Sequence, residues 1–392
     1  MPFDSADVGG MRRFCREVSD VGGSKRDVEK YGDAFGYNDD MHTSEFITVS
    51  NSEYETIAST LDVDVPVEQR CIWDAFDAEL PGRAPWGHLV WMVDEQPRAL
   101  ISLTHFQGRG FVYLWAKKGP VWIGESPTPE EERIFRTQLV AGIRARDSRI
   151  AFVRLHALYE GSDMHELLQS VTYDYTAIVD VANKTGEEII ASFRKRGRKN
   201  VRQRMRVEGL RCSDETENAS TLFPEIYPIM EETGEHSHFG VNEQAVYEKM
   251  LSALGPEYSR LFVAWFNDEP IAWTLAIHTP KSAYLYYGAA SAKARELGAT
   301  DLLDYFAMLT YAQMGVQTVD MMGVDSPRAP QLAGVGGYKR KFVHEDTPVA
   351  PAWDVPVRPA FYKALKFALH AKRATSGALR KIAQRARKRN RS

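Results

Sequence analysis

One stretch of the chain decides the predicted fold: Ala283–Phe342, with the sequence AYLYYGAASAKARELGATDLLDYFAMLTYAQMGVQTVDMMGVDSPRAPQLAGVGGYKRKF. The large residues of Tyr284–Tyr287 predict a strand, and the Gly/Ala-rich run Gly288–Thr300 predicts a loop. Asp301–Met314 has the apolar spacing of a buried helix, and Val316–Met322 predicts a second strand. Parallel strands joined by a helix leave a crevice at their carboxyl ends, where ligands usually bind.

A glycine run follows the second of these strands. We expect Gly334–Gly337 to form a flexible loop that presents Tyr338 and Lys339, an aromatic ring beside a cation. Asp320 is the only carboxylate of the second strand, and we expect it at the strand end in the crevice. The pattern therefore places three candidate functional residues near one ligand-binding crevice.

The same order of elements occurs earlier in the chain. Val90–Ala99 resembles Val263–Ala272, each with a strand, an acidic turn and a second strand. Further matches follow at an offset that narrows from 173 to 166 residues: Tyr113–Trp115 with Tyr284–Tyr286, Glu130–Ala145 with Asp301–Met314, and Ile150–Leu155 with Val316–Met322. Each copy is a strand meander, a helix and a further strand, which is the order of the acetyltransferase-type α+β fold.

We therefore predict an α+β protein with two tandem acetyltransferase-like (GNAT-type) domains and a basic C-terminal helix. The predicted first domain spans residues 44–185, with a return segment at 346–357, and the second spans residues 186–345. The polar residues 1–43 predict a loosely packed N-terminal extension, and residues 358–392 predict a basic amphipathic tail.

Cysteine usage and hydropathy bear on where the protein is expected to act. Three scattered cysteines, Cys15, Cys71 and Cys212, argue against a disulfide framework and for the cytosol. The first 20 residues lack a continuous apolar segment, and no stretch of the chain approaches 18 uncharged apolar residues. We expect a cytoplasmic protein, without a secretion signal or a membrane span.

Charge is distributed unevenly along the chain. Residues 358–392 hold 12 of the 49 Lys/Arg and none of the 53 Asp/Glu, so the first 357 residues carry a net charge of −16. A basic tail on an acidic body predicts contact with phosphate groups. Phe361, Leu365, Ala368 and Leu369 can form an apolar stripe that lies on the anionic inner face of the plasma membrane. Contact with a tRNA backbone and a disordered tail are the alternatives.

A second basic segment, Ser192–Gly209, lies between the two copies. As a helix it would place four arginines on one stripe at i, i+4 spacing: Arg194, Arg198, Arg202 and Arg206. Arginine suits phosphate because its planar fork donates two parallel hydrogen bonds. The alternative interpretation is a solvated basic face that balances the acidic body.

Short motifs in a fixed order then indicate a known family over about residues 45–345. They are Gly119–Pro120–Val121 after a strand, Arg198–Arg202, Met230–Thr233 with Phe239, Asp320–Gly323, and Gly337–Phe342. In order and spacing they resemble the FemABX family of aminoacyl-tRNA-dependent peptidyltransferases, which build peptidoglycan interpeptide bridges. The resemblance implies two acetyltransferase-like domains that use no metal and no acetyl-CoA.

The chemistry that the resemblance implies is acyl transfer from aminoacyl-tRNA to an amine of the precursor's stem peptide or bridge. Lys339 would stabilise the developing negative charge at the ester, and Tyr338 would stack on the terminal adenine. Asp320 would accept the proton of the amine, unless a structural role near Gly323 is its only one. Arg198 and Arg202 would hold the diphosphate of the precursor.

Some positions depart from the family pattern. Family members use a first-domain lysine near a Gln…Trp segment to hold substrate phosphate. Gln69 and Trp73 remain here, but Phe76–Asp77 stands where that lysine is expected, so we predict that Arg83 replaces it. The resemblance also implies that Trp73 and Tyr286 line the substrate site.

The expected partners follow from this interpretation: the acceptor end of aminoacyl-tRNA and a lipid-linked or UDP-linked muropeptide, bound by a monomer. An alternative is an aminoacyl-tRNA- or acetyl-CoA-dependent N-acyltransferase acting on a small molecule or peptide. Arg295–Thr300 nearly matches the pyrophosphate loop of acetyl-CoA enzymes. A non-catalytic RNA- or membrane-binding protein is the third class.

Overall fold

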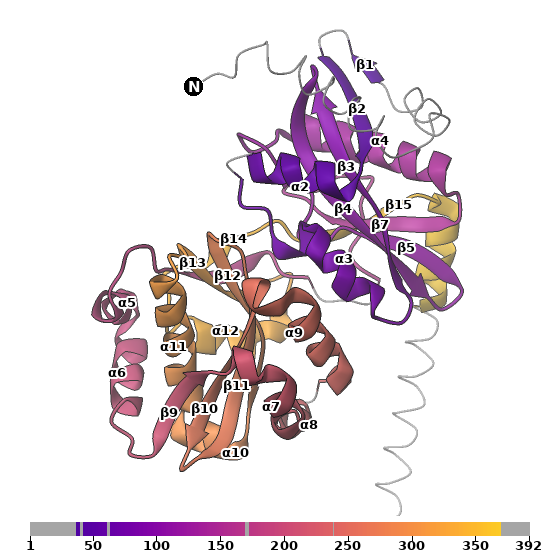
Figure 1. The fold of residues 1–392 in the computed structure, drawn as a ribbon. Helices are drawn as coiled ribbons and strands as arrows, with labels where there is room; N and C mark the ends of the chain where they lie inside the picture. The colour runs from indigo at the N-terminus through magenta and orange to yellow at the C-terminus, as the bar shows by residue number, and fades with distance from the viewer. Residues whose placement is uncertain (1–36, 40–41, 61–62, 169–171, 238, 370–392) are drawn as a thin grey trace, which may run out of the picture.

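The computed structural model describes residues 37–39, 42–60, 63–168, 172–237 and 239–369. Cys15 and the tail residues 370–392 lie outside the described residues, as does most of the predicted N-terminal extension. The described chain forms two mixed β-sheets, each covered by helices (Figure 1). The predicted α+β fold class is confirmed.

The first sheet contains one parallel pair, β5 and β7, among antiparallel neighbours. In spatial order its strands are β1 (Tyr37–Asp39), β2 (His42–Val49), β3 (Arg83–Val93), β4 (Gln96–Gly108), β5 (Phe111–Trp115), β7 (Ile150–His156) and β15 (Ala352–Pro356), with β6 (Val121–Trp122) paired to β4. The helices of this part are α2 (Asn51–Thr60), η1 (Val67–Gln69), α3 (Cys71–Ala78) and the crossover α4 (Pro129–Arg146).

The sequence of α4 shows why the crossover forms there. Thr128 and Glu131 make a reciprocal capping box at its start, with Pro129 in the first helical position. Its buried residues Phe135, Leu139 and Ile143 recur at i, i+4 and pack into the core of the first sheet. The helix thereby forms the crossover between the parallel neighbours β5 and β7.

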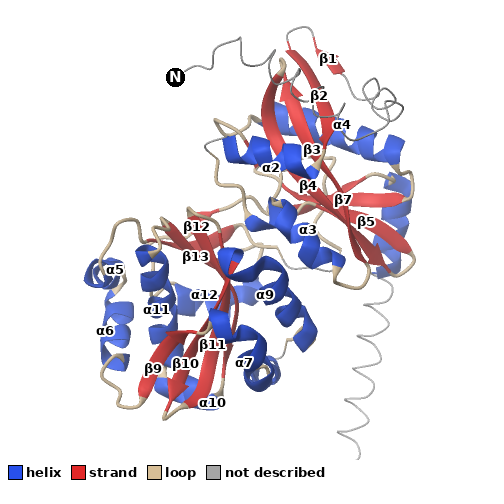
Figure 2. Cartoon of the chain, in the orientation of Figure 1, coloured by secondary structure: helices blue, strands red, loops and turns tan. Residues whose placement is uncertain are grey.

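The second sheet repeats this plan with the parallel pair β12 and β13. In spatial order its strands are β14 (Thr347–Pro348), β8 (Tyr175–Asp180), β13 (Thr318–Gly323), β12 (Ser282–Ala290), β11 (Glu269–His278), β10 (Ser259–Phe266) and β9 (Leu210–Asp214). Its helices are α5 (Gly186–Ser192), α6 (Lys195–Arg204), η2 (Thr216–Asn218), α7 (Ala219–Ile226), α8 (Pro228–Ser237), α9 (Gln244–Tyr258), α10 (Ala292–Leu297), α11 (Ala299–Gln313), η3 (Pro330–Leu332) and α12 (Ala333–Lys339). Figure 2 shows α5, α6 and α11 on one face and α7 and α9 on the other.

The structure bears out the internal repeat at the level of single residues. The turns Asp94–Glu95 and Asn267–Asp268 both have two left-handed residues, with φ of 48° and 64° in the first and 51° and 64° in the second. Such turns suit two-residue hairpins because they match the strand twist. The pairing register also shifts at equivalent points, Trp91–Met92 and Ala264–Trp265.

The chain crosses between the sheets at other points than the predicted boundaries. β8, which lies before residue 185, pairs with β13 of the second sheet because Ala177 and Val179 are buried in the second core. β14 also joins the second sheet, whereas β15 returns to the first, beside β7 (Figure 1). His42 and Thr43 belong to β2 and therefore to the first sheet.

Two segments predicted as loops are helical. Residues 292–297 form α10, because the Ser291 hydroxyl caps its first turn by accepting from the Ala294 N–H at 3.2 Å. The predicted flexible loop Gly334–Gly337 lies within α12. Gly336 lets this helix pack closely, since a Cβ there would come within 2.0 Å of the Asp325 carboxylate. Lys339 is therefore held at the end of a helix and not on a mobile loop.

An apolar cluster joins the two halves of the molecule. Trp73 and Phe76 of α3 pack in one buried cluster with Phe223, Tyr247 and Trp273 of the second half. The Lys249 ammonium donates to the Glu79 carbonyl at 2.7 Å beside this cluster. Elements of both domains thus share a core, which fixes the pocket described below.

The C-terminal part of the described chain is helical over residues 359–369. Phe361, Leu365 and Leu369 pack on Phe152 and the fully buried Tyr362. The predicted apolar stripe therefore faces the first domain and not a membrane, with only Ala368 of that stripe exposed. Within the described ranges, no helix combines the length and the apolar character needed to cross a bilayer.

Candidate functional site

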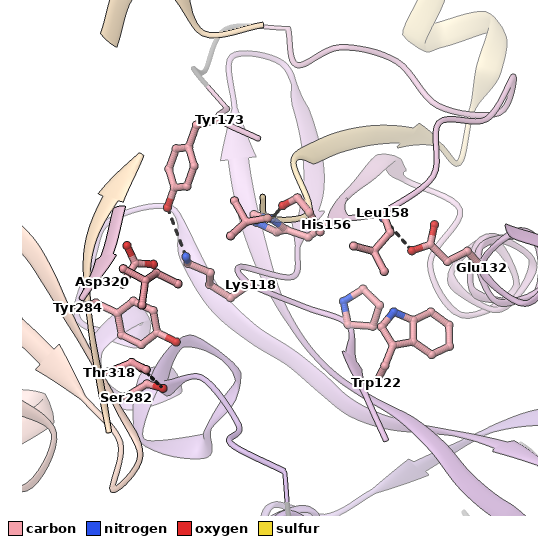
Figure 3. A pocket seen from close by; sticks show the side chains of 14 residues that line it. Lys118, Trp122, Glu132, His156, Leu158, Tyr173, Ser282, Tyr284, Thr318 and Asp320 are labelled. Atoms are coloured by element: carbon pink, nitrogen blue, oxygen red, sulfur yellow. Dashed lines mark hydrogen bonds between the residues drawn. The ribbon is translucent and has the colours of Figure 1, made fainter. Parts of the chain in front are cut away.

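A pocket of about 290 Å³ lies where the two sheets meet (Figure 3). The first domain and the segment that returns to it contribute Lys118, Pro120, Trp122, Glu132, His156, Leu158, Val349 and Ala350. The second sheet and the linker before it contribute Tyr173, Ile178, Ser282, Tyr284, Thr318 and Asp320. The wall mixes aromatic surface with a few polar groups, as ligand pockets commonly do.

The topology explains why the pocket forms there. On the first side, Lys118, His156 and Leu158 lie at or just beyond the carboxyl ends of β5 and β7, where the parallel strands separate. On the second side, Tyr284, Thr318 and Asp320 alternate with Ala283 and Val319, which face α11 in the second core. Side chains alternate along a strand, so the pocket lies on the sheet face opposite α11.

Lys118 is the cation of this pocket. Its backbone has a φ of 57°, and its ammonium donates to the Tyr173 hydroxyl at 3.3 Å (Figure 3). It also lies 5.1 Å from the centre of the Tyr284 ring. Burial alone would lower the pKa of Lys118, but the acidic groups Tyr173, Asp320 and Glu68 together raise it. The side chain therefore keeps its positive charge at neutral pH.

The turn that carries Lys118 is held by a buried amide, Gln69. Its Nε2 donates to the Lys117 carbonyl at 2.7 Å, and its Oε1 accepts from the Ser102 N–H at 2.8 Å. Gly119 lies directly against this amide, because a Cβ there would come within 2.4 Å of Oε1. Gln69 thus binds the Lys117 carbonyl on one side of Lys118 and packs against Gly119 on the other.

Asp320 is a buried carboxylate on the second side of the pocket. It accepts from the Met322 N–H at 2.6 Å and from the Thr176 hydroxyl. Its charge acts on two lysines from different domains, Lys118 and Lys339. Asp320 shares the pocket with Lys118, which the sequence interpretation missed, whereas Lys339 does not line the pocket and reaches the end of the same strand, at Gly323.

Lys339 is partly buried at the end of α12. Its ammonium donates to the Gly323 carbonyl, at the end of β13, at 2.8 Å. Burial lowers its pKa to about 8, while the charges of Asp320 and Asp304 oppose this shift. Both its charged and its neutral form are consequently populated near physiological pH.

Tyr338 lies apart from the pocket. Its hydroxyl donates to Asp304 of α11 at 2.7 Å, and its ring packs against the second core. The Lys341 ammonium lies 3.9 Å from the centre of this ring. Burial raises the pKa of Asp304 to about 6. In this arrangement Tyr338 supports α12 against α11.

The arginine stripe lies on the α11 side of the second sheet. The Arg198 guanidinium donates to the Phe193 carbonyl at 2.5 Å, and Arg202 pairs with Glu187 of α5 at 2.7 Å. Neither side chain lines the pocket. The start of α6 nevertheless contacts the segment after Lys339, since the Arg194 N–H donates to the Lys341 carbonyl at 3.1 Å.

The other predicted binding residues form a second group, next to the turn of Lys118. Trp73 and Tyr286 lie with ring centres 6.1 Å apart, and Arg83 donates to Asp77 at 2.9 Å. Lys117 lies 3.6 Å from the same Asp77 oxygen and 4.8 Å from the centre of the Trp73 ring. Burial lowers the pKa of Lys117 to about 8. A first-domain lysine from the turn before Gly119 thus lies in the region where the sequence pattern had offered none.

Two further titratable residues of the pocket were not anticipated. The His156 Nδ1 donates to the Ala350 carbonyl at 2.8 Å, because a carbonyl can only accept, so Nε2 carries the free lone pair. Burial lowers the pKa of His156 to about 4, which keeps it neutral. Glu132 accepts from the Leu158 N–H at 2.8 Å and the Tyr159 N–H at 3.1 Å, and burial raises its pKa.

The charges around the two crossover helices do not suit the pyrophosphate of acetyl-CoA. The first turn of α4 carries Glu130, Glu131 and Glu132, which would repel an anion at that helix end. In the second domain, Arg295 is engaged by Glu232 at 2.7 Å and by the Ala290 carbonyl. The near-match at Arg295–Thr300 thus spans the end of α10, the left-handed Gly298 and the start of α11, with its arginine already paired.

Comparisons with known proteins agree with this architecture. Residues 191–340 match a family model described as an acetyltransferase (GNAT) domain. The crystal structure of FemX is similar with a TM-score of 0.64 at 14% identity, over 82% of this chain and 100% of FemX. The C-terminal domain assigned to a lysylphosphatidylglycerol synthetase of Agrobacterium fabrum has a TM-score of 0.50 at 15% identity, over 82% of this chain and 96% of that domain.

A comparison with curated protein sequences gave no significant match. At these identities the structural likeness shows the fold, and the matched family model indicates the class of chemistry. The chain carries an acyltransferase domain of the GNAT type and shares its two-domain fold with FemX.

Proposed function

We propose that the protein transfers an amino acid from aminoacyl-tRNA to an amine of a peptidoglycan precursor. The observation that carries the proposal is that Lys118 of the first GNAT-like domain and Asp320 of the second line one interdomain pocket, with Lys339 hydrogen-bonded to the end of the strand that carries Asp320. The likeness to the FemX fold and the FemABX motif order add support.

The reaction needs little chemical activation, because the donor is already an ester. The acceptor nitrogen forms a bond with the aminoacyl carbon, the bond from that carbon to the ribose oxygen breaks, and the nitrogen's proton ends on the released hydroxyl. Positioning and stabilisation of negative charge are therefore the main tasks of the enzyme. Lys118 and Lys339 supply positive charge for the oxyanion and the leaving oxygen.

Two groups of the pocket can take part in moving the proton. Asp320 has lone pairs beyond those used by Thr176 and Met322, and His156 presents a free Nε2. A pocket of about 290 Å³ suits the reacting ends of two substrates and not a whole precursor. The remainder of each substrate would lie outside it.

The phosphates of the precursor have two candidate holders. Arg83 and Lys117 share Asp77, and Lys117 lies over the Trp73 ring and directly precedes Lys118 of the pocket. Arg198 and Arg202, proposed from the sequence, are paired as well, with the Phe193 carbonyl and with Glu187, but they lie on the α11 side of the second sheet and do not line the pocket. We therefore assign the binding of the precursor's phosphates to Arg83 and Lys117, and we keep Arg198 and Arg202 of α6 as the second candidate for this role.

The matched acetyltransferase family favours one alternative, an acetyl-CoA-dependent N-acyltransferase. The acidic start of α4 and the engaged Arg295 argue against it. Mass spectrometry of a muropeptide acceptor, incubated with the full chain and either charged tRNA or acetyl-CoA, separates the two. We expect a mass increase of one aminoacyl residue with charged tRNA only. Acetylation of the acceptor, with no aminoacylation, would contradict the proposal.

A further inference from the structure

The C-terminal helix of residues 359–369 has two faces with different surroundings. One face is docked on the first domain through Phe361, Leu365 and Leu369. Tyr362 anchors it, since its hydroxyl donates to the buried Asp354 carboxylate at 3.1 Å. Asp354 in turn pairs with Arg154 of β7 at 2.7 Å. The helix is thus fixed to the sheet through a buried polar network.

The other face is exposed and partly apolar. Phe367 is 76% exposed, more than any other large apolar side chain that the structure describes. At helical spacing it lies beside Ala360 and Ala364, and Lys363 and Lys366 flank this strip on one side. All of these side chains are exposed. A single exposed apolar residue is ordinary on a protein surface. The charge around Phe367 therefore has to indicate whether it belongs to a binding surface.

That charge has a single sign. Residues 358–392 contain 12 Lys/Arg and no Asp/Glu, whereas the rest of the chain carries a net charge of −16. We propose that this helix face, with Phe367 at its centre, binds an anionic lipid surface. Phe367 would enter the boundary between headgroups and acyl chains while the lysines contact lipid phosphates. A nucleic-acid backbone would use the lysines but would leave the phenylalanine in water.

The position of the helix gives this contact a consequence for the pocket. The helix packs on Phe152 of β7, and His156, four residues further along the same strand, lines the pocket. At ~3.3 Å per residue these two positions are ~13 Å apart. On the basis of the proposed function, a protein bound through this helix would hold its pocket within reach of the headgroup of a lipid-linked acceptor.

Vesicle co-sedimentation of the full chain tests the proposal. Vesicles of phosphatidylcholine alone are compared with vesicles that also contain phosphatidylglycerol. We expect binding to the anionic vesicles only, reduced about fivefold or more by Phe367→Ser. Replacing Lys363 and Lys366 by Gln should reduce it by about fivefold per lysine. Met314→Ser, which removes another exposed apolar side chain, is the matched control and should change nothing.

Binding of labelled tRNA by the same variants tests whether a nucleic acid, the other phosphate-bearing partner, uses the same surface. We expect Phe367→Ser to leave tRNA affinity unchanged. Equal binding to neutral and anionic vesicles, or vesicle binding that is unaffected by Phe367→Ser, would overturn the proposal. Transfer to a UDP-linked muropeptide, measured separately, reports on the proposed function, so failure of one inference is distinguishable from failure of the other.

Discussion

Lys118 and Asp320 come from different domains and line the same pocket, and the charge of Asp320 helps to keep Lys118 protonated. Each is set by its own half of the molecule: Lys118 by the turn after β5, and Asp320 by its hydrogen bonds within β13 and to β8. A site divided in this way exists only when both domains are folded and packed together. The shared apolar cluster of α3, α7 and α9 maintains that packing.

Removing the charge of Lys118 should impair chemistry more than substrate binding. We predict that Lys118→Met lowers the single-turnover transfer rate about 100-fold, because it removes one stabiliser of the developing oxyanion. Lys118→Arg should recover a large part of this loss. Lys293→Met, at an exposed lysine of α10, is the control and should retain the wild-type rate. An unchanged rate in Lys118→Met would show that Lys118 has no role in transfer.

The pH dependence of transfer should report the protonation of Lys339. Its pKa is lowered to about 8 by burial, so the fraction of ammonium falls as pH rises through that value. If the ammonium form is the active one, the rate with saturating substrates should fall across the same range. Lys339→Arg keeps its charge there and should remove the fall. A wild-type rate that rises through pH 8, and no longer does so in Lys339→Arg, would instead assign Lys339 as a base.

Acid should destabilise the protein partly through His156. Burial lowers its pKa from 6.5 to about 4, so the unfolded chain takes up a proton in this range before the folded chain does. The stabilising contribution is therefore present above pH 6.5 and is lost as pH falls towards 4. We predict that His156→Asn, whose amide can still donate to Ala350, makes the free energy of unfolding less acid-sensitive by about 3 kcal/mol. Urea denaturation of both proteins at pH 7 and pH 4 measures this, and identical acid sensitivity would be the contrary result.

Gln69 and Gly119 should behave as a coupled pair. Gly119→Ala brings a methyl group against the buried Gln69 amide, so we predict a loss of about 1–3 kcal/mol in unfolding free energy. In a Gln69→Ala background the space is free, and the same change should cost about 0.5 kcal/mol or less. Chemical denaturation of the four proteins gives the coupling energy. Additive effects would mean that the amide does not hold the Lys118 turn.

Much of the fold could be predicted because the same order of strands and helices occurs twice in the sequence. The apolar spacing of Asp301–Met314 and the strand residues on either side are local signals, and their recurrence at a nearly constant offset fixed the domain type. The boundaries between the domains were harder to predict from the sequence. β8 belongs to the second sheet through its pairing with β13, a contact over more than a hundred residues that no local pattern encodes.

The site was predicted in part. Asp320, which lines the pocket, was proposed because one carboxylate stood in an apolar strand, and Lys339, which does not line it, was proposed from a motif. The glycines around Lys339 indicated a loop, but Gly336 serves close helix packing against Asp325. Lys117 and Lys118 were missed, although a pair of lysines directly before a Gly-Pro turn was a visible signal. His156 and Glu132 became recognisable only when the return segment and β7 were placed side by side.

A double-mutant cycle between the two domains tests the central claim most directly. Single-turnover transfer from charged tRNA to a muropeptide is measured for wild type, Lys118→Met, Lys339→Met and the double variant. If both lysines act on one transition state, each single change should slow transfer about 100-fold or more, and the double variant should be little slower than the worse single one. Losses that multiply in the double variant, or the absence of a loss in either single variant, would contradict a site shared between the two domains.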